Sequence, residues 1–81
     1  MEELARKLLE GKNLVYIYND GARPHIMKNW HFMGIHDGMA RFYYGGELGY
    51  MHEVNMTADS LFQLKDKGSV KYSCGTLKYL S

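Results

Sequence analysis

The chain has 81 residues and a formal net charge of +1, so it has the size of one small domain and little overall charge. A balance this close to neutral argues against a broad electrostatic hold on DNA or on a membrane surface. Hydrophobic residues make up 46% of the chain, but seven of them are tyrosines and six are methionines, which serve adaptable interfaces as well as cores. We expect a single compact domain over residues 1–81.

The cysteine content and the N-terminal segment bear on the compartment. Cys74 is the one cysteine, so no internal disulfide can form, which is typical of a reducing environment. The N-terminal segment lacks the apolar run of a signal peptide, and no stretch approaches the length of a membrane span. These features favour a cytoplasmic protein with no membrane contact.

The start of the chain has the pattern of a short helix. Glu2 and Glu3 lie where the helix dipole favours acidic side chains, and Gly11 is a typical stop signal. Apolar side chains recur between these ends at helical spacing: Leu4, Ala5, Leu8 and Leu9. The pattern predicts a helix over residues 2–10 with one apolar face.

After Lys12 the pattern changes to short strands and tight turns. Hairpin turns are predicted at Asn19-Asp20-Gly21, at His36-Asp37-Gly38 and at Cys74-Gly75, and one strand is expected to break near Asn29. The predicted strands cover residues 14–18, 25–35, 39–44, 48–56, 70–74 and 77–80.

Between the strands expected at residues 48–56 and 70–74, the pattern predicts a single helical turn. Asp59 is expected to cap this turn, which carries Leu61, Phe62 and Leu64, and residues 65–68 are expected to form a polar loop. The element order predicts an α+β fold: a short N-terminal helix followed by a strongly bent antiparallel sheet or small partly open barrel of five to six strands.

Metal and thiol chemistry are not expected from the residue spacing. The four histidines, His25, His31, His36 and His52, do not form the closely spaced pairs that are typical of zinc sites. Cys74 is expected to be a small core residue rather than a nucleophile. We therefore expect neither a metal nor a cofactor.

A small ribonuclease-like enzyme is one alternative function. Its general acid–base and phosphate-stabilising groups would come from His31, His52, Arg41, Tyr43 and Tyr50. The low net charge argues against this alternative, because an RNA-binding protein needs a basic surface.

The aromatic and methionine content favours a binding protein instead. Tyr, Trp and Met are enriched at the centres of interfaces, so we expect a non-enzymatic module that docks on a macromolecular partner through an aromatic and Met-rich sheet face. Stand-alone inhibitors of phages and other mobile elements often have this build. The expected partner-binding residues are Trp30, Phe32, Arg41, Phe42, Tyr43, Tyr44 and Tyr50.

Two further alternatives concern what this face contacts. Self-association as a two-fold homodimer would use Trp30, Phe32, Phe42 and Tyr44. Alternation places the first two on one face of their strand and the last two on one face of the adjacent strand, and all four form one aromatic patch if these faces coincide. Capture of a nucleotide-like ligand or single-stranded nucleic acid would use Tyr or Trp rings to stack on bases.

Overall fold

The computed structural model describes residues 1–80 and has two helices and one six-stranded sheet. The helices are α1 (Glu2–Leu9) and α2 (Ala58–Lys67), and the strands are β1 (Leu14–Tyr18), β2 (His25–His36), β3 (Met39–Gly45), β4 (Met51–Met56), β5 (Ser69–Lys71) and β6 (Gly75–Tyr79). The sheet is antiparallel in the order β4-β3-β2-β1-β6-β5 and does not close into a barrel over these residues. The prediction of an α+β fold that begins with a helix is confirmed.

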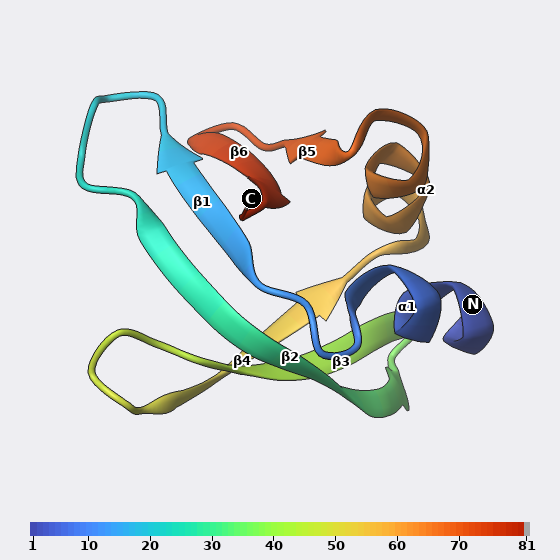
Figure 1. Cartoon of the computed structure of the whole chain (residues 1–81). Coiled ribbons are helices and arrows are strands. Elements are labelled where there is room, and N and C mark those ends of the chain that lie inside the picture. Colours follow the sequence, from blue (N-terminus) through green and yellow to red (C-terminus); the bar gives the residue numbers. More distant parts are fainter. Residues whose placement is uncertain (81) are drawn as a thin grey trace.

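Strand β2 joins the two halves of the sheet and gives it its bend. Its first residues pair with β1 and its later residues with β3. The pairing with β3 shifts register between Lys28 and His31 and again between Phe32 and Ile35. Asn29 (φ 54°) lies within the first shift, where a bulge bends a strand and asparagine tolerates the left-handed region. The strand does not break near Asn29 as expected but continues through the bulge to His36, and Figure 1 shows β2 running between β1, β5 and β6 on one side and β3 and β4 on the other.

Both helices pack against one face of this bent sheet and build the core with it. In Figure 1 they lie together at the end opposite the β1–β2 and β3–β4 loops. The buried cluster comprises Ala5, Leu9, Leu14, Met27, Trp30, Ala40, Phe42, Tyr44, Met56, Leu61, Leu64, Val70 and Leu77. The segment after α1 is fixed to the bulge of β2, because Gly11 N donates to Trp30 O (2.8 Å) and Trp30 N donates to Lys12 O (3.1 Å).

Helix α2 is longer than the single turn expected from the sequence. Its cap is Thr57 rather than Asp59, since the Thr57 hydroxyl oxygen accepts from Ser60 N at 3.1 Å. Residues 65–67, expected in a loop, form its last turn, where the lysines complement the helix dipole. The helix ends at Gly68, which adopts the left-handed conformation (φ 72°) that glycine accommodates without strain.

Two strand boundaries and the position of Cys74 also differ from expectation. Strand β4 begins at Met51 rather than at residue 48, because residues 46–50 form a loop with Gly49 at φ 83°. The last hairpin turns at residues 72–74, so that Gly75 already belongs to β6. Cys74 lies in this turn and is exposed, so its assignment to the core is wrong.

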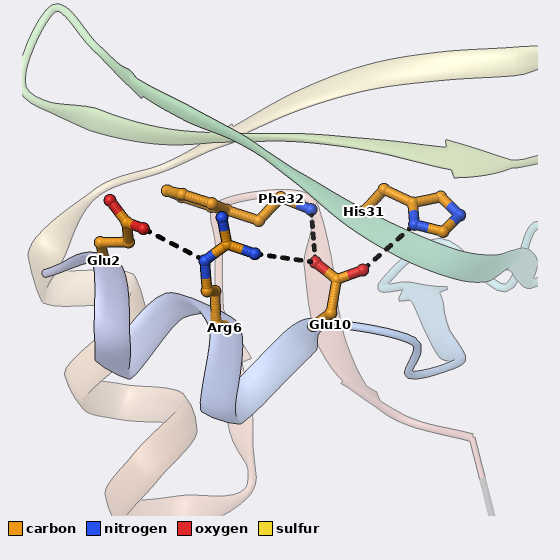
Figure 2. A network of polar contacts seen from close by, with 5 residues as sticks. All are labelled: Glu2, Arg6, Glu10, His31 and Phe32. Atoms are coloured by element: carbon orange, nitrogen blue, oxygen red, sulfur yellow. Dashed lines mark hydrogen bonds and ion pairs between the residues drawn. The ribbon is translucent and has the colours of Figure 1, made fainter.

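A polar network fastens the end of α1 to β2 (Figure 2). One Glu10 carboxylate oxygen accepts from Phe32 N at 2.9 Å, and the other lies 3.1 Å from His31 Nδ1. Arg6 pairs with Glu2 at 3.2 Å and holds its guanidinium 4.8 Å from the centre of the Phe32 ring. The Phe32 backbone hydrogen bond is the main cause that lowers the pKa of Glu10 below its ordinary value; His31 and Arg6 add to it, and partial burial opposes it.

Candidate functional site at the loop end of the sheet

Two loops that are separate in sequence meet at one end of the sheet. These are residues 19–24 between β1 and β2 and residues 46–50 between β3 and β4, which together we call the loop end (Figure 1). They are joined by an ion pair between Arg23 Nη2 and Glu47 Oε2 at 2.9 Å. The second loop is also ordered by its own backbone, because Gly46 N donates to Tyr50 O and Gly49 N donates to Gly46 O.

The second loop and the first residue of β4 carry a cluster of exposed apolar side chains, which we call the hairpin tip: Leu48, Tyr50 and Met51. Their exposed fractions are 85%, 68% and 60%, the three highest values among the large hydrophobic side chains of residues 1–80. Scattered apolar residues on a surface are ordinary, but three within four residues form a local patch. The hairpin tip is therefore a candidate contact surface.

A pocket of about 350 Å³ opens between the two loops. Its floor and walls combine aromatic rings, imidazoles and one ion pair. The lining residues are Tyr18, Arg23, Pro24, His25, Gly46, Glu47, Leu48, Tyr50 and His52. A mostly apolar hollow with a few convergent polar groups is the usual form of a ligand site.

A column of aromatic rings runs from the core to this pocket. The Trp30 and Tyr44 rings are stacked with centres 5.6 Å apart and planes inclined by 19°, and the Tyr44 and His52 rings follow at 5.3 Å and 30°. His25 Nε2 lies 3.1 Å from Tyr44 Oη, so a second imidazole is fixed beside the column. Burial, with a contribution from Tyr18, raises the pKa of Tyr44, so that its phenol stays protonated at neutral pH and can donate to an unprotonated His25 Nε2.

A second hollow of about 280 Å³ lies where β4, at one edge of the sheet, faces β1 and β6. Its lining is almost entirely apolar: Tyr16, Met27, Val54, Asn55, Met56, Tyr72 and Leu77. The Tyr72 hydroxyl donates to Ser60 Oγ at 3.1 Å and so ties the last turn to α2. This hollow lacks the convergent polar groups of the loop-end pocket.

The expected aromatic sheet face is largely the core of the protein. Trp30 and Phe42 have no exposed surface, Tyr44 is 7% exposed, and Phe32 is partly buried under Arg6. The patch proposed for a homodimer is thus already covered within one chain, and its assignment as an exposed contact set is wrong. The physical reason is the closed core, in which these rings are clustered with side chains from both helices and from the other half of the bent sheet, such as Leu14 and Leu77.

The other expected partner-binding residues lie in two different places. Arg41 and Tyr43 are on β3; Arg41 Nε lies 3.5 Å from a Glu53 carboxylate oxygen, and Tyr43 pairs across strands with Glu53 and is 36% exposed. Tyr50 is part of the hairpin tip and of the pocket wall.

The residues expected for a ribonuclease-like site fall into two groups rather than one. Tyr50 and His52 line the loop-end pocket, whereas His31 on β2 pairs across strands with Tyr43 on β3, and Arg41 lies two residues from Tyr43 on β3, outside that lining. Sequence reasoning missed His25, Leu48 and Met51. The signal was available, because alternate turns of an antiparallel meander fall at the same end of the sheet, which brings residues 19–24 near residues 46–50.

No protein-family model, no curated protein and no solved structure matches this chain. Within residues 1–80, no group of three or more histidine, cysteine, aspartate or glutamate side chains is placed to hold a metal ion. In the same part of the chain, no helix has both the length and the apolar character needed to cross a membrane.

Proposed function

We propose that this protein is a non-enzymatic binding module that docks on a protein partner through its hairpin tip. The observation that carries the proposal is the exposure of Leu48, Tyr50 and Met51 at one hairpin, at 85%, 68% and 60%. Tyrosine and methionine are enriched at interface centres, because they bring a large contact area and adapt to the partner's surface. The expected role of Tyr50 is retained, whereas Trp30, Phe42 and Tyr44 stabilise the fold behind it.

The energetic argument concerns the surface that the hairpin tip leaves in water. Complete burial of a side chain such as leucine or methionine is worth roughly 1.5–3 kcal/mol relative to exposure. A partner that covers the tip gains this free energy, and the cross-loop ion pair of Arg23 and Glu47 holds the tip in place before binding. Such a module acts by occupying a surface of its target, and inhibition is the simplest consequence.

The test compares partner retention by matched variants in extracts of the source cells. We expect Leu48→Asp and Met51→Asp to weaken partner binding by about 2 kcal/mol or more each, because each places a charge at the centre of the contact. The controls are Met33→Asp and Phe62→Asp, which change exposed apolar residues on β2 and α2 (45% and 53% exposed).

The expected result is a partner retained by the wild type and by both controls and lost by both tip variants. Thermal unfolding of each variant checks that the fold is intact. Equal retention by the tip variants, or loss only with Met33→Asp or Phe62→Asp, would show that the docking surface lies elsewhere.

A further inference from the structure

We propose that the loop-end pocket binds a nucleobase, and that it does so by continuing the column of stacked rings formed by Trp30, Tyr44 and His52. The column begins in the core and reaches the pocket at His52, which is one of the lining residues. A flat heteroaromatic ring placed on its end would stack as the protein rings do. Stacking of this kind is tolerant of base identity, because every base has a π face.

The pocket also offers hydrogen-bonding groups for the edge of a base. An unprotonated His52 carries one ring nitrogen that donates and one that accepts. His25, whose Nε2 accepts from Tyr44 Oη, offers its Nδ1 as a donor, and Tyr18 and Tyr50 add hydroxyls. His25 is held in position by its 3.1 Å contact with Tyr44 Oη. Bases present donors and acceptors side by side on one edge, so this mixed set suits them better than it suits a purely apolar ligand.

Size and charge decide which part of a nucleotide is held. A volume of about 350 Å³ lies near the lower end of the range for ligand pockets, roughly 300–1,000 Å³, which limits the occupant to one base with its sugar. The formal charges of Arg23 and Glu47 cancel in their 2.9 Å ion pair, so no unpaired cation is left to grip a phosphate. We therefore assign the binding energy to the base and not to the phosphate.

The backbone at Gly46 supports the same geometry. A Cβ atom added there would lie 2.9 Å from His52 Nε2, closer than such contacts normally come. The absence of a side chain at residue 46 lets the imidazole take its place at the end of the column. A substitution at this position tests the column without removing any ring.

The experiment is titration of the whole protein with adenosine, guanosine, cytidine and uridine, followed by calorimetry and NMR. We expect at least one nucleoside to bind more tightly than about 1 mM, with shifts at Tyr50 and His52. The matching monophosphate should bind within about three-fold of the nucleoside, and the affinity should change little with salt, since few phosphate contacts are made.

Variants separate stacking from a merely structural role of the ring column. His52→Ala should weaken binding about ten-fold or more, whereas His52→Phe, which keeps a ring, should retain most of the affinity. Gly46→Ala should weaken binding because it displaces His52. His36→Ala, at the opposite turn between β2 and β3, is the matched control and should bind as the wild type does.

A further comparison of ligands shows whether the bound base belongs to a nucleic acid or to a free nucleoside. A single-stranded tetranucleotide that binds at least ten-fold more tightly than its nucleoside would assign the site to nucleic acid; equal affinity would assign it to free nucleosides and nucleotides. No binding by any of the four nucleosides up to about 1 mM, or binding unchanged by His52→Ala, would overturn the proposal. Met51 does not line the pocket, so Met51→Asp should weaken partner docking and leave nucleoside binding intact, which keeps this test independent of the proposed function.

Discussion

Gly75 lies at the closest approach of β6 to β1. A Cβ atom on this residue would lie 2.7 Å from the Tyr16 ring and would also overlap the carbonyl oxygen of Ile17. Because one of these neighbours is backbone, the overlap cannot be relieved by turning a side chain. We predict that Gly75→Ala lowers the free energy of unfolding by about 1–3 kcal/mol, as measured by denaturant unfolding.

The neighbouring Cys74→Ser variant is the matched control, because Cys74 is exposed in the preceding turn. It should change stability by no more than about 0.5 kcal/mol. A Gly75→Ala protein as stable as Cys74→Ser would show that β1 and β6 are farther apart than described.

At the level of single elements, the end of α1 depends on the ionised form of Glu10. The folded state lowers the pKa of Glu10, so the unfolded chain binds more protons near that pH and stability rises with pH. The contribution is present above about pH 4.5 and is lost as the pH falls through the lowered pKa of the folded state. We predict that Glu10→Gln costs about 0.5–1 kcal/mol at neutral pH, because the carboxylate is partly exposed and glutamine can still accept from Phe32 N.

The measurement is the free energy of unfolding of both proteins between pH 7 and pH 3. The difference between wild type and Glu10→Gln should shrink toward the acidic end. Glu3→Gln on the same helix, for which the structure of residues 1–80 shows no ion pair, should give a difference that is small at every pH. A Glu10→Gln difference that stays constant would contradict the role assigned to the charge.

The elements themselves were largely predictable, because their signals are local. Alternating aromatic and β-branched residues predicted β1, and turn residues predicted the hairpin at residues 36–38. Helix α2 was predicted too short. Its last turn, residues 65–67, consists of charged residues, which are as typical of a solvent-exposed loop as of a helix end.

Which face of the sheet is covered was not predictable from alternation alone. The pattern placed Trp30 on one face of its strand and Phe42 and Tyr44 together on one face of theirs. Whether these faces belong to the core depends on which other elements pack against them. Because the closing of the bent sheet and both helices over this surface is a tertiary feature, three core residues were expected as contacts. The loop-end pocket depends on the pairing of residues 19–24 with residues 46–50, a tertiary relation that no single stretch of sequence contains.

At the scale of the whole molecule, structural and binding roles are separated along the sheet. The helices lie at one end, and the two loops that form the loop end lie at the other (Figure 1). The ring column from Trp30 to His52 connects the core with the loop-end pocket. Exposure of apolar surface at the loop end is then tolerated because stability is supplied elsewhere.

The most direct test of docking by the hairpin tip is hydrogen exchange of the backbone amides in the free protein and in its complex with the captured partner. If the tip is the docking surface, the partner should slow exchange across residues 46–52 and leave the opposite turn at residues 36–38 unchanged. Protection at residues 36–38, or along β3 near Tyr43, with no change across residues 46–52, would contradict it.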